Sequence, residues 1–187
     1  MKQGQGRFKR YAMVVEVKKC FNCKGCVVAC RAENNVPLPI SRNWIEESGI
    51  RGRYPFLGQT FEPAACNHCE RPPCERVCPT GATYRTSEGI VMVDNRKCIG
   101  CKYCIQACPY QARSVNRRDK VIEKCTFCIH RLEEGRIPAC VETCMGGARH
   151  FGDVNNPDSE VARLLAHKDS YVKKSEAGTR PAFYYVF

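Results

Sequence analysis

The stretch "KCIGCKYCIQACPYQAR", residues 97–113, decides the fold. It places four cysteines within eleven residues, at Cys98, Cys101, Cys104 and Cys108. Disulfide bonds usually join cysteines that are distant in sequence, whereas tight C-x2-C runs suit a shared metal centre. The even total of sixteen cysteines permits disulfides, but this spacing favours metal ligation.

The remaining twelve cysteines form three more groups of four, and none is left over. The first has the spacing C-x2-C-x2-C-x3-C of the opening stretch, the second has C-x2-C-x4-C-x3-C, and the fourth has C-x2-C-x11-C-x3-C. We call the four groups runs one to four, so that residues 97–113 hold run three. The other runs are Cys20, Cys23, Cys26 and Cys30; Cys66, Cys69, Cys74 and Cys78; and Cys125, Cys128, Cys140 and Cys144.

The runs repeat in the order A, B, A, B. "EVKKCFNCKGCVVAC", residues 16–30, aligns without gaps on "DNRKCIGCKYCIQAC", residues 94–108. "CERVCPTGA", residues 74–82, aligns in the same way on "CVETCMGGA", residues 140–148. Internal repetition of this kind indicates a duplicated structural unit.

The spacing within a run predicts iron–sulfur clusters rather than zinc. Three cysteines at C-x2-C-x2-C sit on one tight loop, and their sulfurs can converge on one cluster. The three-residue step to the last cysteine begins a helix and directs its sulfur to a second cluster, as in two-cluster ferredoxins. Zinc sites pair C-x2-C units across longer gaps and rarely add two more cysteines so closely.

The short linker between runs two and three, residues 79–97, shows which runs belong together. It predicts two strands, at 83–85 and 90–93, joined by a turn at 87–89. Such a hairpin brings runs two and three side by side as one ferredoxin module. Runs one and four then complete each other across the length of the chain.

The predicted fold is therefore α+β, with two interlocked bacterial-type 2[4Fe–4S] ferredoxin-like modules, one inserted in the other. The outer module comprises residues 11–36 and 120–152, and the inserted module comprises residues 60–115. Residues 37–59 form a connector rich in proline and glycine. Residues 153–187 begin with capping residues and an apolar helical face, which predict a short helix before an extended aromatic tail.

The crossing of each fourth cysteine assigns all sixteen cysteines to iron in four clusters. Each predicted ligand set takes three cysteines from one run and one from the partner run. Set 1 is Cys20, Cys23, Cys26 and Cys144; set 2 is Cys30, Cys125, Cys128 and Cys140; set 3 is Cys66, Cys69, Cys74 and Cys108; set 4 is Cys78, Cys98, Cys101 and Cys104.

The formal net charge of +11 would by itself suggest nucleic acid or an anionic membrane surface. Four oxidised clusters with their thiolates contribute about −8, which leaves only about +3. The basic excess therefore offsets anionic clusters within the molecule. A zinc-stabilised, nucleic-acid-binding module is the remote alternative, and a brown protein bleached by dithionite would exclude it.

Several function classes lack support in the sequence. There is no Ser-His-Asp or paired-carboxylate pattern and no G-x-G-x-x-G or phosphate loop, so the chain is expected to be non-catalytic. His68 and His130 each lie in a run that already has four cysteines as ligands, so we expect both histidines to be structural neighbours. No apolar run approaches the roughly 20 residues that span a bilayer. The basic start, residues 1–17, is not a secretory signal, so a partner is expected to supply any address or anchor.

Beyond the cysteines, the chain resembles the four-cluster iron–sulfur electron-transfer B subunits of molybdopterin oxidoreductases of the dimethyl sulfoxide reductase family. The resemblance covers residues 11–186, and within the family the chain is most similar to the corresponding subunits of polysulfide, thiosulfate and arsenate reductases. One departure is "CMGG" after run four, where many relatives have proline after the cysteine. The segments that carry the likeness are "RYAMVVEVKKC", "CNHCERPPCERVCPTGATY", "DNRKCIGCKYCIQACPYQAR", "KCTFCIHRLEEGRIPACVETC", "FGDVNNPDSEVARLL" and "GTRPAFYYV".

The resemblance implies that the chain is the electron-transfer subunit of a larger complex. A large molybdenum or tungsten bis-pterin subunit would do the chemistry, and an integral membrane subunit would exchange electrons with quinone. Co-export with a twin-arginine partner would place the complex on the periplasmic face, although a cytoplasmic face also fits. A free-standing polyferredoxin that carries electrons by diffusion is the alternative.

Overall fold

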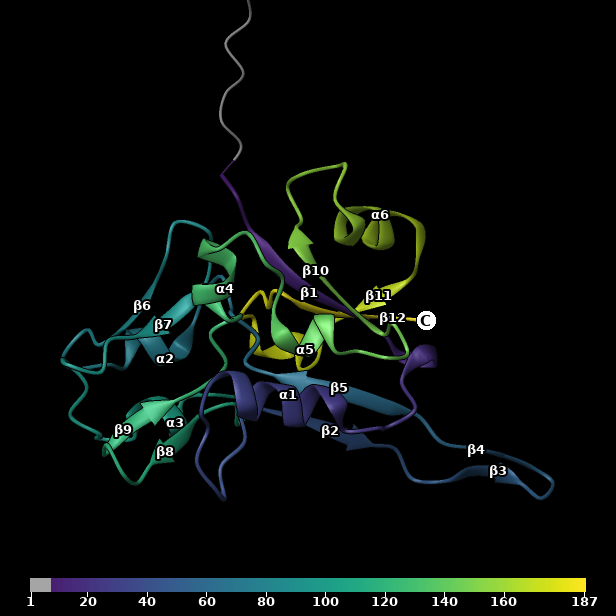
Figure 1. Ribbon diagram of the computed structural model, residues 1–187, viewed down its shortest axis with the longest axis horizontal. Helices are drawn as coiled ribbons and strands as arrows, with labels where there is room; N and C mark the ends of the chain where they lie inside the picture. Colours follow the sequence, from purple (N-terminus) through teal and green to yellow (C-terminus); the bar gives the residue numbers. More distant parts are fainter. Residues whose placement is uncertain (1–7) are drawn as a thin grey trace, which may run out of the picture.

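The computed structural model describes residues 8–187 (Figure 1). Residues 1–7, the first part of the basic start, therefore lie outside the described residues. The helices are short, and most strands have three to six residues. In chain order the elements are β1 (Tyr11–Glu16), η1 (Val17–Lys19), α1 (Gly25–Glu33), β2 (Asn43–Glu47), β3 (Arg51–Arg53), β4 (Phe56–Gly58), β5 (Phe61–Ala65), α2 (Pro73–Arg76), β6 (Thr83–Arg85), β7 (Val91–Val93), α3 (Tyr103–Gln106), β8 (Ser114–Asn116), β9 (Val121–Glu123), α4 (Ile129–Glu133), α5 (Ala139–Glu142), β10 (Arg149–Asp153), α6 (Glu160–His167), β11 (Ser170–Tyr171), η2 (Ser175–Ala177) and β12 (Phe183–Val186).

A four-stranded sheet joins the two ends of the described chain, in the order β10-β1-β12-β11. β1 pairs antiparallel with β10 and parallel with β12, where Met13 lies opposite Phe183. The aromatic tail, which the sequence predicted only as an extended segment, thus forms a strand of this chain's own sheet. In Figure 1 the yellow tail lies beside the purple first strand.

Both faces of this sheet are covered, which explains why β1 is apolar from Ala12 to Val15 rather than alternating. One face buries Met13 and Val15 with the aromatic rings of Phe127, Phe183 and Tyr185. On the other face Val14 and Val186 pack against Val161 of α6. Helix α6 is the helix expected in the last segment, and its N-terminus is capped because Ser159 Oγ accepts a hydrogen bond from the Ala162 N–H at 3.2 Å.

Residues 66–123, which we call the inserted half, contain small two-stranded hairpins instead of a larger sheet. We call residues 8–65 and 124–187 the outer half. β6 and β7 pair antiparallel, with Thr83 opposite Val93, so the hairpin predicted between runs two and three is confirmed. β8 and β9, of three residues each, form a second hairpin before run four. Ile122 of β9 packs against Val91 of β7, so this second hairpin lies against the first.

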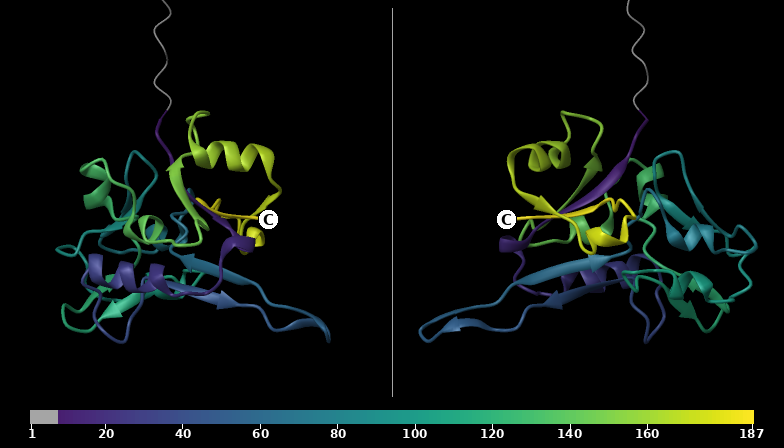
Figure 2. Two further views of the ribbon diagram at one scale, coloured as in Figure 1. Left: turned by 45° about the vertical axis from the view of Figure 1, so that its right-hand side comes forward. Right: turned by 180° about the vertical axis from the view of Figure 1, so that it is seen from behind.

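The connector is more ordered than the sequence predicted. β2 pairs with β5, and the buried Asn43 donates from Nδ2 to the carbonyl of Cys26 at 2.8 Å, which holds this ladder against α1. Beyond it, β3 and β4 form a hairpin, residues 49–59, that we call the arm. The arm projects from the body in every view (Figures 1 and 2). Its sharp bend needs glycine, because a Cβ at Gly52 (φ +97°) would lie 2.1 Å from the Phe56 carbonyl oxygen.

Within residues 8–187, every helix is too short or too polar to cross a bilayer.

Candidate iron–sulfur sites

All sixteen cysteines lie in the described part of the chain, and all are free thiols. The disulfide alternative that the even count allowed is therefore not realised. Two cysteines, Cys23 of run one and Cys101 of run three, are exposed. Eight are buried: Cys26, Cys30, Cys66, Cys69, Cys74, Cys104, Cys128 and Cys140.

The four cysteines of set 2 line one cavity. Its other walls are mainly apolar and include Met13, Ala65, Phe127 and Phe183. Runs one and four, which lie about a hundred residues apart in sequence, thus meet at one cavity. The cysteines that line it are Cys30, Cys125, Cys128 and Cys140.

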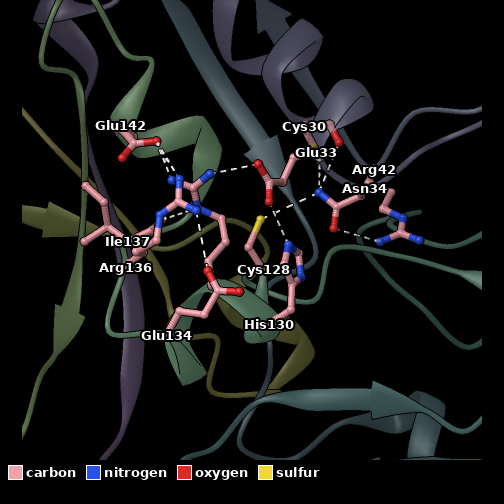
Figure 3. Close-up of polar contacts among 11 residues, drawn as sticks. Cys30, Glu33, Asn34, Arg42, Cys128, His130, Glu134, Arg136, Ile137 and Glu142 are labelled. Atoms are coloured by element: carbon pink, nitrogen blue, oxygen red, sulfur yellow. Dashed lines mark hydrogen bonds and ion pairs between the residues drawn. The ribbon is translucent and has the colours of Figure 1, made fainter.

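A polar network that includes the lining residues Asn34 and Arg42 lies beside this cavity (Figure 3). Asn34 Nδ2 lies 3.8 Å from Cys30 Sγ and 3.6 Å from Cys128 Sγ, so one amide contacts a sulfur from each run. His130 Nε2 contacts Glu33 Oε1 at 2.8 Å instead of a cysteine. His130 is therefore a structural neighbour here, as expected.

The buried guanidinium of Arg131 belongs to the same network. Its Nη1 donates to Glu33 Oε2 at 2.8 Å, its Nη2 pairs with Glu142, and its Nε donates to the Ile137 carbonyl at 2.8 Å. These contacts join α1 to α4 and α5, which carry the two parts of the outer half. Arg131 is thus a buried cation whose charge is neutralised by two carboxylates.

The four cysteines of set 4 line a second cavity, with Val93 and Ile122 among its walls. Burial raises the pKa of the Cys78 thiol, but the backbone N–H of Thr83, 3.5 Å from Cys78 Sγ, and neighbouring donors outweigh burial and lower it overall. Donors that stabilise a thiolate also suit a sulfur bound to iron. The cysteines of this cavity are Cys78, Cys98, Cys101 and Cys104.

The cysteines of set 3 gather around Tyr110. Cys66 and Cys69 pack with Tyr110 and Ala112 in one buried group, and Cys108 packs against it. The pKa of the Cys69 thiol rises to about 12, first because of burial and then because Cys66, Cys74 and Cys108 are close. All four members of the set therefore lie near one another.

The cysteines of set 1 come together where run four returns to run one. Burial raises the pKa of the Cys20 thiol, and the nearby Cys26 and Cys144 add to the rise. Gly146 packs so closely on run one that a Cβ there would lie 2.6 Å from the Lys19 carbonyl oxygen. This contact gives a physical reason for Gly146. It does not explain Met145, the residue that stands where many relatives have proline.

The donor set fits iron–sulfur clusters. Burial raises the pKa of Cys30 to about 12 and of Cys74 to about 11, and it raises the pKa of Cys125 well above its usual value. Bare thiolates are thus disfavoured, whereas a bound metal deprotonates its thiols outright. Among residues 8–187, no three His, Cys, Asp or Glu side chains are close enough to hold one metal ion. In sets 2 and 4 the cysteines instead surround cavities lined by soft sulfur donors, which suit iron and sulfide.

His68, in run two, is fully buried and makes no bond to a cysteine sulfur. Its Nδ1 accepts a hydrogen bond from the Val91 N–H at 3.1 Å, and its ring stacks on Phe127 with centroids 3.7 Å apart. It therefore joins the inserted half to the outer half, in agreement with the structural role expected for it.

Sequence reasoning missed three buried cations beside the cysteines. Arg113 is 4% exposed, and it donates to Cys74 Sγ at 3.0 Å and to Thr83 Oγ1 at 3.1 Å. Lys124 is 3% exposed, and its ammonium donates to the carbonyl of Cys125 at 2.6 Å and to that of Val91.

The third of these cations is Arg149, which is 3% exposed and lines the cavity of set 2. It donates from Nη1 toward Cys140 Sγ at 3.7 Å and from Nη2 to Asn43 Oδ1 at 2.9 Å, while its buried Nε has no partner. A signal existed in the sequence. Arg113 and Arg149 each stand five residues after the last cysteine of a run, in "CPYQAR" and "CMGGAR".

Comparison with known proteins agrees with this geometry. The family model of the 4Fe-4S dicluster domain matches residues 57–154. The chain is 45% identical to the B subunit of tetrathionate reductase from Salmonella typhimurium, over 95% of this chain and 72% of that protein. It is 47% identical to the protein of the same name from Archaeoglobus fulgidus, over 95% and 82%. It is 40% identical to the putative iron-sulfur B subunit of dimethyl sulfoxide reductase from Halobacterium salinarum, over 94% and 78%.

The chain belongs to the iron–sulfur B subunits of dimethyl sulfoxide reductase-family oxidoreductases. As a member of this family it is a 4Fe–4S protein and a subunit of the electron-transport type. The dicluster domain and the mixed helix and strand content agree with the ferredoxin-like class predicted from the runs. The relatives' names identify them as subunits of reductases, so a separate catalytic chain is part of the family pattern.

Proposed function

We propose that this chain relays electrons through four [4Fe–4S] clusters between a molybdopterin catalytic subunit and a second redox partner. When bound, each cluster accepts and releases one electron. The residues of the chain hold the clusters, exclude water from them and expose the first and last to partners. The observation that carries the proposal is that the cysteines of set 2 and of set 4 each line one cavity, while cysteines of sets 1 and 3 lie close to one another.

Contacts between sets support a single line of clusters. The thiol of Cys140 in set 2 is close enough to Cys26 in set 1 for their charges to interact, and Cys125 in set 2 interacts with Cys66 in set 3. Arg113 interacts with both Cys74 in set 3 and Cys104 in set 4. These contacts link set 1 to set 2, set 2 to set 3, and set 3 to set 4. They therefore support a line of clusters in the order 1-2-3-4.

The exposure of the sets supports electron entry and exit at opposite ends of this line. Cys23 in set 1 and Cys101 in set 4 are exposed, whereas sets 2 and 3 have no exposed cysteine. Apolar side chains stand beside both ends, with Phe21 and Met145 exposed near set 1 and Ile99 and Tyr103 exposed near set 4. Exposed apolar groups beside a redox centre are suited to contact with a protein partner.

The arm supports contact with a partner at the set 1 end. Ile50, Tyr54, Phe56 and Leu57 are 72%, 85%, 86% and 55% exposed, and a two-stranded hairpin of this size is marginally stable alone. Its base is tied to the loop of run one, because Glu47 accepts bonds from Asn22 and Lys24. The arm's charged residues are both arginines, so we propose that it enters an apolar groove with acidic edges on the redox partner at this end.

The proposed partners are a large molybdenum or tungsten pterin subunit and an integral membrane subunit that exchanges electrons with quinone. The chain would then be held at the membrane by a partner, and we favour the periplasmic face. Fractionation of intact cells tests this location, because protease added to spheroplasts should degrade a periplasmic chain and spare a cytoplasmic one.

Metal analysis of the anaerobically purified chain tests the cluster count. Four clusters require about sixteen iron and sixteen sulfide per chain, and about eight of each would leave only two clusters. Zinc in place of iron would contradict the proposal. Co-purification with a large pterin-containing chain would identify this protein as a subunit of a complex. A free-standing electron carrier would instead purify as a monomer that still transfers electrons.

Single cysteine replacements test the ligand sets. Cys30→Ser should alter the cluster held by Cys125, Cys128 and Cys140 and leave the cluster held by Cys20 intact. Electron paramagnetic resonance of the reduced protein reports which signal changes. A loss of the cluster at Cys20, with the other preserved, would show that the fourth cysteines do not cross.

A further inference from the structure

Three buried cations, Arg149, Lys124 and Arg113, occupy the three junctions between successive ligand sets. Each interacts electrostatically with a cysteine from the set before it and with a cysteine from the set after it. Burial lowers the pKa of the Lys124 ammonium, and the nearby Cys66 and Cys125 act against that fall. Each junction has one such cation. The flanking cysteines are, in the order of the sets, Cys26 and Cys140, Cys66 and Cys125, and Cys74 and Cys104.

The protein does not neutralise these three charges. Their hydrogen-bond partners are two carbonyls, a hydroxyl, an amide oxygen and cysteine sulfurs, and among residues 8–187 none of them is a carboxylate. Arg131, which is equally buried, differs because Glu33 and Glu142 pair with it. A buried charge needs a counter-charge, and the groups beside the three junction residues that become anionic when they bind metal are the cysteine sulfurs.

The orphaned nitrogen of Arg149 points to the same conclusion. Its Nε is buried and unpartnered although its two other nitrogens are bonded to Cys140 and Asn43. Arg149 also lines the cavity enclosed by the cysteines of set 2. An unpartnered donor on a residue that lines a sulfur-lined cavity is explained if an anionic group with acceptor sulfurs occupies that cavity.

We propose that Arg149, Lys124 and Arg113 are junction cations, which raise the reduction potentials of the two clusters on either side of them. This inference rests on the four-cluster function proposed above. Reduction by one electron makes a cluster more negative, so a fixed positive charge beside it stabilises the reduced form more than the oxidised form. Because the cation lies between two clusters, it also weakens the repulsion between neighbours that are reduced at the same time.

Burial is what makes these three residues effective. The chain has 30 lysines and arginines, but charges at the surface are screened by water and salt within about a Debye length, about 8–10 Å at physiological ionic strength. A charge in the low-dielectric interior acts with little screening on the clusters that it contacts. Each junction cation should therefore tune only the clusters on its two sides, whatever the total charge of the protein.

Redox titration of the intact, anaerobically purified chain tests this inference, with electron paramagnetic resonance as the readout. Arg113→Gln should make two of the four midpoint potentials more negative, by about tenfold in the reduction equilibrium, or about 59 mV for one electron. Arg149→Gln should lower the other two. Lys124→Met should lower one potential from each pair, because it faces sets 2 and 3. This pattern can be read without knowing which potential belongs to which cluster.

Charge-keeping variants separate electrostatics from packing. Arg113→Lys should leave all four potentials near those of the wild type, and so should Arg118→Gln, whose side chain is 83% exposed. If Arg113→Gln loads less iron, Arg113→Lys must restore the iron content; a lysine variant that also fails to load overturns the inference. Unchanged potentials with full iron, or an equal shift of all four, also overturn it. A wild type with fewer than four clusters would instead defeat the proposed function itself.

Discussion

The outer and inserted halves of the molecule are stabilised in different ways. The outer half has a four-stranded sheet and supplies nine of the ten buried residues of the main core, of which two are cysteines; the tenth is Ile90 of the inserted half. The inserted half has hairpins whose strands have three residues each. Each of its two buried groups contains four residues, two of them cysteines. Since sulfur ligands make up half of its buried groups, the inserted half should depend on metal for its fold, whereas the outer half can retain structure without it.

Removal of iron should have the largest effect and tests the comparison directly. After anaerobic chelation, amides of residues 66–113 should exchange hydrogen about 100-fold faster or more, because their order is coupled to metal binding. β1 and β12 should keep most of their protection, since aromatic and aliphatic side chains bury them. Hydrogen exchange with mass spectrometry measures both regions in one sample. Equal loss of protection in the two halves would contradict the comparison.

Truncation of the sheet core should destabilise the outer half. Phe183 is 1% exposed and packs with Met13 and Tyr185, so Phe183→Ala should cost about 3–5 kcal/mol through lost burial and a cavity. The urea midpoint under anaerobic conditions measures the change. Phe187→Ala, at a side chain 53% exposed, should stay within about 0.5 kcal/mol of the wild type. Equal effects of the two variants would show that the tail does not stabilise the core.

The ion network at the end of β1 should have the next largest effect. Burial raises the pKa of the Glu16 carboxyl, but bonds from Lys168 and Lys19 outweigh burial and bring it to about 2. A depressed pKa stabilises the fold above the unfolded value of 4.5, and this contribution is lost as the pH falls toward 2. Glu16→Gln should therefore cost up to about 3 kcal/mol in urea unfolding.

The pH dependence of this cost distinguishes the two effects on Glu16. His150 Nε2 lies 2.9 Å from Glu16 Oε1, so the comparison is made in a His150→Gln background. There the cost should be the same at pH 6 and pH 8, because the carboxylate stays ionised throughout that range. If burial prevailed instead, Glu16 would be protonated at pH 6 and glutamine would replace it at little cost there. A cost that appears only at pH 8 would therefore contradict the depressed pKa.

A contact between the tail and the inserted half should give the smallest effect. Tyr110 donates to or accepts from Thr179 Oγ1 at 2.5 Å, and both side chains are buried. Tyr110→Phe should cost about 1 kcal/mol, the usual value of one hydrogen bond. Tyr84→Phe is the matched control, because the Tyr84 side chain is 43% exposed. Thermal unfolding in the presence of bound clusters measures both, and equal costs would show that the tail does not hold the inserted half.

Local patterns in the sequence predicted the features that local chemistry determines. The turn at 87–89 predicted the β6–β7 hairpin, and a capping serine before an apolar stripe predicted α6. Cysteine spacing also predicted which sulfurs lie together, as the cavities of sets 2 and 4 illustrate. The assignment of ligands to clusters and the limits of the two modules stay predictions.

Long-range features were missed because no local signal encodes them. β12 pairs with β1 across some 170 residues, and nothing near Phe183 indicates that Met13 is its neighbour. In the same way, Asn43 becomes buried only because β2 meets α1, so the connector looked like a loop. The junction arginines are different, because a local signal existed: each stands five residues after the last cysteine of a run. In a chain with 30 lysines and arginines, that spacing gains meaning only once the burial of the two residues is known.

The position of β12 within the sheet has a consequence for biosynthesis. β12 lies between β1 and β11, so the sheet closes only after the ribosome has made residue 186. Runs two and three are translated well before that point, whereas the outer half must wait for its last strand. Assembly factors that deliver iron and sulfide therefore meet two kinds of acceptor during maturation: a nascent inserted half that needs the cargo to fold, and an outer half that receives it after translation.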